Sequence, residues 1–98
     1  DENLTLGWTA KGILDDIRKI GPGLRDILKK HKLEQTQIIV VYPLVDAYGN
    51  EREGDVLRVL YDIETMKKIN WDNIAIENLP NLSINTFMHP DIRDALEK

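Results

Sequence analysis

Four apolar residues in the first third of the chain follow the spacing of a helix: Ile13, Leu14, Ile17 and Ile20. At i, i+1, i+4 and i+7 they form one apolar stripe, which predicts a helix over residues 10–20 that packs on a core. Thr9 is the expected N-cap, because its hydroxyl can accept from the unpaired N–H groups of the first turn. Residues 1–8 show no clear period and are expected to form a flexible tail.

Gly21-Pro22 predicts the end of this first helix, because the residue before a proline disfavours the α region. Proline also suits the first turn of a helix, where its missing N–H would be unpaired in any case. A second helix is therefore expected over residues 22–33. This helix is expected to bury Leu24, Ile27 and Leu28.

From Gln37 onward the hydrophobic period changes to that of strands. The run Ile38–Val41 is β-branched and apolar at every position, which favours a central strand covered on both faces. Residues 55–63 alternate between apolar and polar, which is typical of a half-exposed strand. The expected strands cover residues 37–48, 51–63 and 82–88, with a short helix between the last two and another at the end.

Together these elements predict an α+β fold in the order α-α-β-β-α-β-α. Two N-terminal helices would pack on a small antiparallel sheet of three strands, and residues 1–98 would form a single domain. The third strand could pair with either neighbour, and the pattern does not choose between them.

Composition narrows the classes of protein. The chain has 98 residues, 42% hydrophobic and 31% charged, and its longest apolar run is far shorter than the ~20 residues of a membrane span, so no membrane insertion is expected. The absence of cysteine excludes disulfides, thiolate catalysis and cysteine-ligated metals. That absence, with a start at Asp1, slightly favours an exported protein, and the compartment stays open.

The formal net charge of −4 argues against a general nucleic-acid binder, because phosphate affinity depends mainly on cations. The charge is unevenly distributed. Residues 1–33 carry seven basic and five acidic side chains, net +2, whereas residues 34–98 carry six and twelve, net −6.

The acidic stretch DAYGNEREGD, residues 46–55, allows three hypotheses. A calcium loop beginning at Asp46 would need a glycine at its sixth position and an acid at its twelfth, but these are Glu51 and Leu57, so the match fails. A carboxylate catalytic site would need a cleft that gathers the acids and separates their pKa values. The hypothesis of a hairpin tip requires the fewest special features, because Gly49-Asn50 can adopt the positive φ angles of a tight turn.

In that hairpin, Tyr48 would face Glu51 and Asp46 would face Glu53. An exposed tyrosine beside an arginine is a plausible recognition patch, because such residues are frequent at interface hot spots. The alternative is that Tyr48 lies flat over Arg52. The expected protein-binding residues are Asp46, Tyr48, Arg52 and Glu53.

A second motif is KIGPGLRDIL, residues 19–28. It resembles the helix-hairpin-helix family, in which a Gly-Pro hairpin places backbone N–H groups of a helix N-terminus against a DNA phosphate. Lys19 replaces the first glycine and Arg25 the small residue of that motif, and an ordinary turn between helices fits equally. The residues that this alternative assigns to nucleic acid are Lys19, Gly21, Gly23, Lys29, Lys30 and Lys32.

Signatures of other chemistry are missing from the sequence. His31 and His89 are the only histidines and have no HxxxH spacing, and there is no phosphate-binding loop or serine elbow. No metal, cofactor or catalytic residue is expected. The leading hypothesis is a non-catalytic protein-interaction domain, a fragment or mature form of an exported protein, with an unidentified protein partner; weak nucleic-acid binding through residues 18–32 is the alternative.

Overall fold

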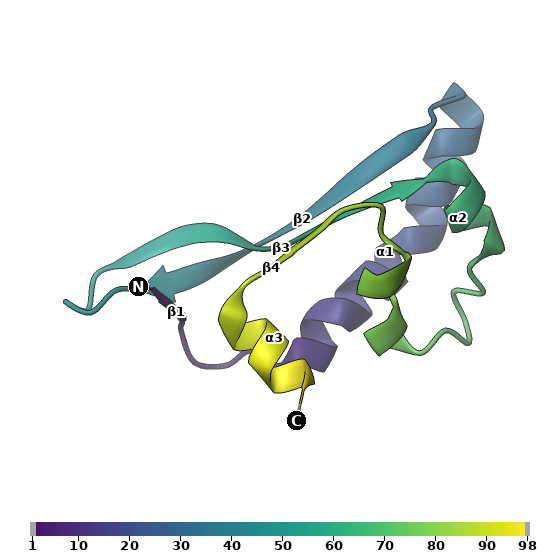
Figure 1. The fold of residues 1–98 in the computed structure, drawn as a ribbon. Helices are drawn as coiled ribbons and strands as arrows, with labels where there is room; N and C mark the ends of the chain where they lie inside the picture. The colour runs from purple at the N-terminus through teal and green to yellow at the C-terminus, as the bar shows by residue number, and fades with distance from the viewer. Residues whose placement is uncertain (1, 98) are drawn as a thin grey trace.

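The long antiparallel hairpin of β2 (Gln35–Val45) and β3 (Glu51–Asp62) forms the centre of the sheet (Figure 1). The computed structural model describes residues 2–97. Two short strands complete a curled four-stranded antiparallel sheet in the order β1-β2-β3-β4, namely β1 (Asn3–Leu4) beside β2 and β4 (Thr86–Met88) beside β3.

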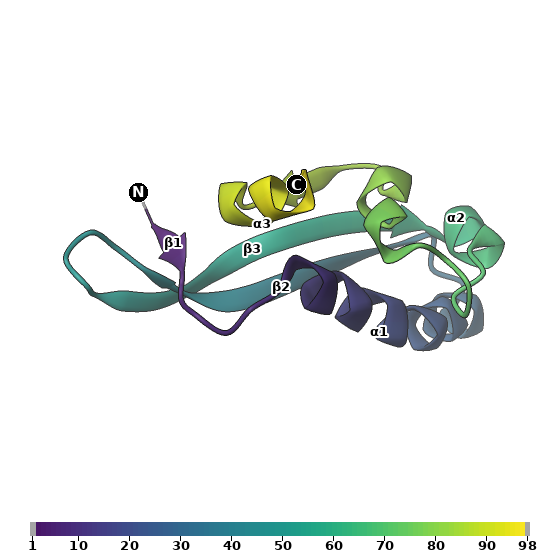
Figure 2. The same ribbon diagram turned by 90° about the horizontal axis from the view of Figure 1, so that it is seen from below.

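Helices cover one face of this sheet (Figure 2). The longest is α1 (Ala10–His31), followed after β3 by α2 (Ile63–Lys68) and after β4 by α3 (Pro90–Leu96). Two 3-10 turns, η1 (Ile76–Asn78) and η2 (Pro80–Leu82), lie between α2 and β4. The core between the layers is aliphatic except for Tyr61, Trp71 and Met66, and includes Leu14, Ile17, Val59, Leu79 and Ile92.

α1 is one continuous helix, so the prediction of two N-terminal helices is wrong. Pro22 lies inside it and leaves the carbonyl of Arg18 without its helical N–H donor. Gly21 lowers the cost of this proline, because without a Cβ it avoids part of the clash with the proline ring. A Cβ on Gly21 would also lie 2.2 Å from the Trp71 ring, so the glycine lets the indole pack on the helix backbone.

β3 contains one extra residue. Val40 pairs with Leu57 and Val41 with Asp55, which leaves Val56 as a β-bulge. Because of the bulge, the neighbouring residues Val56 and Leu57 are both fully buried. The bulge bends the hairpin and changes which residues of β3 face the core side, and the Val56 carbonyl accepts a hydrogen bond of 2.8 Å from the His89 N–H.

The predicted three-stranded sheet is also wrong, because β1 lies in the segment expected to be a flexible tail. Leu4 is buried there, and its N–H donates to the Asp91 carboxylate at 3.0 Å. β4 pairs with β3 and is shorter than the predicted strand 82–88. Ile20 and Ile27, expected to face the core, are about half exposed.

Replacing the buried Gly21 and the exposed Gly23 of α1 by alanine, one at a time, tests the contact with Trp71. Gly21→Ala is expected to destabilise the fold by about 1–3 kcal/mol, because the new methyl overlaps a buried indole. Gly23→Ala is the matched control, since no atom lies within 4 Å of its added Cβ, and it should stabilise the helix by about 0.5–1 kcal/mol. Denaturant unfolding of both variants measures the difference, and equal effects would contradict the contact.

Candidate functional site

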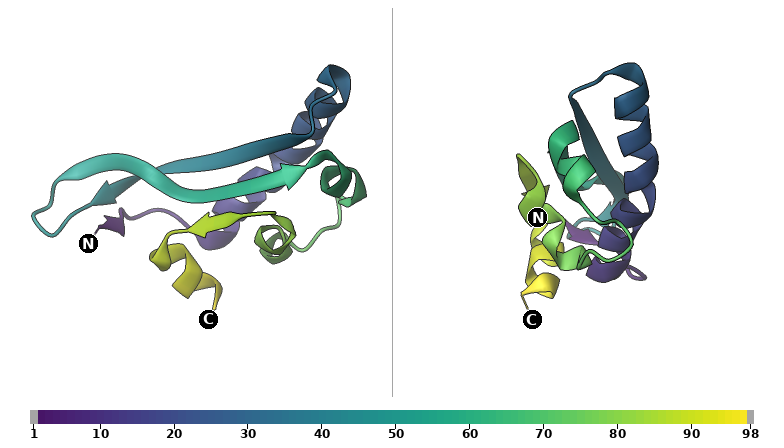
Figure 3. Two further views of the ribbon diagram at one scale, coloured as in Figure 1. Left: turned by 45° about the horizontal axis from the view of Figure 1, so that its top comes forward. Right: turned by 90° about the vertical axis from the view of Figure 1, so that its right-hand side faces the viewer.

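The turn end of the β2–β3 hairpin extends beyond the helices, and β1 pairs with β2 just before the turn (Figures 1 and 2). It contributes to the elongated shape of the chain, whose longest dimension is 46 Å. α2 and the C-terminal end of α1 lie at the opposite end (Figure 3). The hairpin tip is therefore the part of the described chain that reaches furthest from the core.

The turn at the tip is built around Asp46. The Asp46 N–H donates to the Asn50 carbonyl at 3.0 Å, and the Gly49 N–H donates to the Asp46 carbonyl at 3.1 Å. Gly49 has a φ of 83°, a left-handed conformation that favours glycine. The Asp46 carboxylate also accepts from the N–H groups of Tyr48 and Asn50, both at 2.9 Å.

A hairpin is confirmed here, but the predicted register is wrong. The loop is Ala47-Tyr48-Gly49, and Asn50 already faces Asp46. Glu51 therefore pairs with Val45, not with Tyr48, and Glu53 pairs with Pro43, not with Asp46. Gly49-Asn50 favours a two-residue turn by its local conformational preference, whereas the carboxylate of Asp46 stabilises the longer loop through backbone N–H groups.

The four predicted protein-binding residues have different surroundings. Tyr48 is 90% exposed at the tip, and a ring this exposed does not lie flat over Arg52. Arg52 instead donates two hydrogen bonds to the Glu2 carboxylate, with Nε 2.8 Å from Oε2. This bond raises the pKa of Arg52 and ties the N-terminal segment to β3. The Asp46 carboxylate stabilises the turn through its hydrogen bonds, and Glu53 is exposed to solvent.

The acids of the stretch do not gather in one cleft. Asp46 is engaged in the turn, and Asp55 forms an ion pair of 3.2 Å with Arg58. The hollow beside the hairpin is lined by Leu4, Thr5, Leu6, Val45 and Glu51, so it contains one of the four acids. The arrangement therefore gives no geometric support to the carboxylate-site hypothesis.

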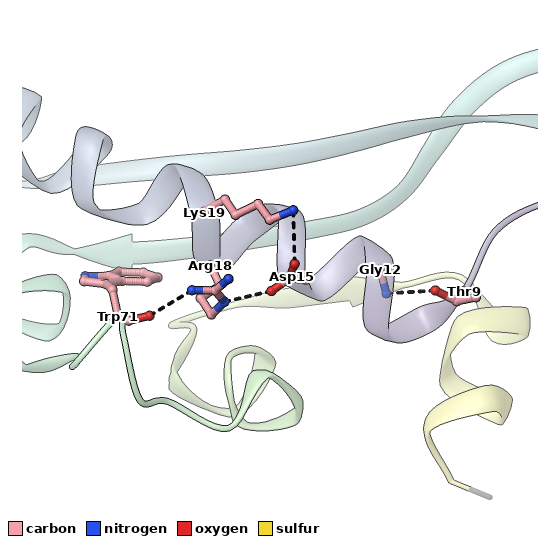
Figure 4. Close-up of polar contacts among 6 residues, drawn as sticks. All are labelled: Thr9, Gly12, Asp15, Arg18, Lys19 and Trp71. Carbon is pink, nitrogen blue, oxygen red and sulfur yellow. Dashed lines mark hydrogen bonds and ion pairs between the residues drawn. The ribbon is translucent and has the colours of Figure 1, made fainter.

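The residues assigned to nucleic acid lie along α1 without a helical hairpin. Lys19 forms an ion pair of 3.3 Å with Asp15, which also binds Arg18 (Figure 4). Gly21 is buried against Trp71, and Gly23 is exposed in the helix. The backbone N–H groups that would hold a phosphate are inside a continuous helix, which removes the geometry that the resemblance implied.

The remaining lysines of that set, Lys29, Lys30 and Lys32, are exposed at the C-terminal end of α1. Lys32 adopts a φ of 56° and closes the helix, because its N–H bonds to the carbonyls of Leu28 and Lys29. Cations in a last helical turn stabilise the helix macrodipole. Their position is thus explained by the helix itself.

The two histidines have separate roles. His31 is exposed, whereas His89 is buried and caps α3 by accepting from the Asp91 N–H through Nδ1 at 3.1 Å. His89 Nε2 then donates to the Glu2 carbonyl at 3.0 Å. Within residues 2–97, no three side chains of His, Cys, Asp or Glu are grouped so that they could hold a metal ion.

Comparison with known proteins adds no relative. No protein-family model, no curated protein and no solved structure matches the chain. None of the helices described between residues 2 and 97 has the length and hydrophobicity of a membrane-spanning segment.

Acidification tests the role of Asp46. The N–H groups of Asn50 and Tyr48 hold the pKa of its carboxyl below the ordinary value. The carboxylate therefore stabilises the turn above the unfolded-state pKa of about 3.9, and this contribution is lost as pH falls through the lower, folded-state pKa. NMR titration should show the Tyr48 and Asn50 amide signals moving together in that acidic range.

Asp46→Asn is the control for this titration, because its side chain keeps an acceptor but cannot ionise. Its Tyr48 and Asn50 amide signals should not respond to pH in that range. If they move as in the parent chain, the titrating group is not Asp46.

Proposed function

We propose that this chain is a protein-binding domain that contacts its partner through the hairpin tip. The observation that carries the proposal is Tyr48, a large aromatic side chain that is 90% exposed at the most distant point of the hairpin. Tyrosine contributes much contact area with few rotatable bonds, which is why it is enriched at interface hot spots. At this exposure the ring buries little apolar surface within the fold.

The hairpin is held in a defined conformation by contacts on both sides of Tyr48. The hydrogen bonds of Asp46 close the turn. Just before the turn, β1 pairs with β2 as an additional strand, with Leu4 opposite Leu44. The Arg52–Glu2 pair fastens β3 to the same segment. Binding through a restrained loop loses less conformational entropy than binding through a mobile one, which supports a recognition role.

The charges around the tip indicate the chemistry of the partner. Residues 46–55 carry four acids and one arginine, net −3, and Glu51 and Glu53 are exposed beside the turn. A partner with an apolar recess for the tyrosine ring and basic side chains around it would match this surface. We therefore expect binding to weaken as salt is raised.

Photo-crosslinking tests the hairpin tip. A photoreactive phenylalanine analogue in place of Tyr48 should give a discrete adduct in a lysate of the native organism, because a binding tip must touch its partner. The same analogue at Ile84 is the matched control and should give no such adduct, because Ile84 is an exposed apolar position whose N–H bonds to the Leu60 carbonyl, at the end of β3 far from the turn. Mass spectrometry identifies the adduct.

Competition decides whether that adduct reflects binding. Excess unlabelled parent chain should remove it, whereas excess Tyr48→Ala chain should not. Equal competition by both chains, or equal adducts from positions 48 and 84, would contradict recognition by Tyr48.

Nucleic-acid binding stays a prediction that rests only on exposed lysines near the end of α1. It requires a complex with DNA or RNA at ~50 mM salt that dissociates as salt is raised. Fluorescence anisotropy of the parent chain and of Lys29→Glu/Lys30→Glu measures this. Absence of binding by the parent chain at that salt would end the alternative.

A further inference from the structure

The outer edge of β2 is unpaired over most of its length. β1 covers only Leu44 and Val45, and the Thr5 N–H adds one bond of 3.1 Å to the Pro43 carbonyl. This bond shows that the Pro43 backbone points away from β3. Because backbone groups alternate along an antiparallel strand, those of residues 37, 39 and 41 point outward too, and no strand or loop within residues 2–97 pairs with them.

This edge lacks the features that usually prevent strands from pairing. Native proteins protect an edge with charged residues, proline or a bulge. β2 has no charged residue from Gln35 to Val45, its proline lies beside Thr5, just after the end of β1, and the bulge belongs to β3. Ile39 and Val41 are 47% and 49% exposed beside the unpaired edge.

The neighbouring flank of α1 is apolar as well. Ile20 and Ile27, seven residues apart on one stripe, are 47% and 49% exposed. The opposite flank carries Arg18, which bonds to the Trp71 carbonyl and so faces the segment after α2. α1 runs along the β2 side of the molecule, with α2 and the 3-10 turns toward β4 (Figures 2 and 3). The Ile20/Ile27 stripe and the unpaired edge therefore face the same side.

Charge is separated along the direction of β2. The end that holds the start of β2 and α2 carries five exposed lysines and two exposed acids, net +3: Lys29, Lys30, Lys32, Lys67 and Lys68 with Glu34 and Glu64. The hairpin end carries Asp46, Glu51 and Glu53 with Arg52, net −2. An antiparallel arrangement of two copies along β2 brings the basic end of each beside the acidic end of the other. A parallel arrangement would bring like charges together.

We propose that this chain forms a two-fold symmetric homodimer through antiparallel pairing of its β2 edges, centred on Ile39. In this register Ile39 exchanges backbone hydrogen bonds with Ile39 of the second copy, and Val41 faces Gln37 of the second copy. The two sheets become one continuous sheet of eight strands. A two-fold axis normal to the sheet keeps both α1 helices on one face, where their Ile20/Ile27 stripes meet.

The hairpin tip lies outside this interface, so the dimer would display two copies of Tyr48. The dimer proposal is independent of the proposed function, because it depends on the middle of β2 and on α1. Failure of one leaves the other intact.

Sedimentation equilibrium measures the association. The apparent mass of the parent chain should rise with protein concentration from 11.3 kDa to twice that value, and the dimer fraction should fall as the salt concentration is raised. Ile39→Lys should remain monomeric, because two ammonium groups would face each other at the axis. Asn85→Lys adds the same charge at an exposed position beyond β3, before β4, and should dimerise like the parent chain. A parent chain that stays monomeric up to about 1 mM would overturn the proposal. The same holds if the β2 edge binds a segment of another protein but no second copy of this chain.

Disulfide crosslinking tests the register without relying on a charged variant. The chain has no cysteine, so Ile39→Cys introduces a single thiol. Paired residues on the two-fold axis would have Cα atoms about 5.5 Å apart, within the range of a disulfide. Oxidation should link most of the Ile39→Cys chain into covalent dimers and little of the Asn85→Cys chain. Equal crosslinking of the two variants would overturn the pairing of β2.

Discussion

The bulge at Val56 is the constraint on which the arrangement of the chain depends. It allows β3 to bury two consecutive residues, and it bends the hairpin, whose turn end projects beyond the helices (Figure 1). The same residue accepts from the His89 N–H, and His89 in turn reaches the Glu2 carbonyl. The N-terminal segment, β3 and α3 therefore meet at one point of the sheet.

The hydrophobic pattern predicted the α+β class, the central hairpin and the first half of α1, because these depend on local periodicity. It did not predict the continuous helix, since Gly21-Pro22 is a strong local stop signal. Packing against the sheet and Trp71 outweighs that signal, and a contact between residues 50 positions apart is invisible to a window of ten. β1 was missed for the same reason, because two residues carry no period.

At the candidate site, the sequence predicted an exposed Tyr48 at a hairpin tip but not the register of the turn. Turn preference alone favoured Gly49-Asn50, whereas side-chain acceptance by Asp46 decided the outcome. A signal was present, because an aspartate three residues before a glycine is typical of a type I turn followed by a left-handed residue. Arg52 could not be assigned, since its partner Glu2 lies 50 residues away.

The close contact of Gly21 with Trp71 also limits how α1 can move. A helix lying on a sheet can in principle rotate about its axis or slide along it. Either motion would bring the side chain of Ile20 or the ring of Pro22 onto the indole, whose N–H donates to the Met66 carbonyl, while Arg18 donates to the backbone carbonyl of Trp71. The missing methyl group of Gly21, together with the buried apolar stripe of α1, thus limits the rotation and sliding of a 22-residue helix, and with them the direction in which Ile20 and Ile27 face.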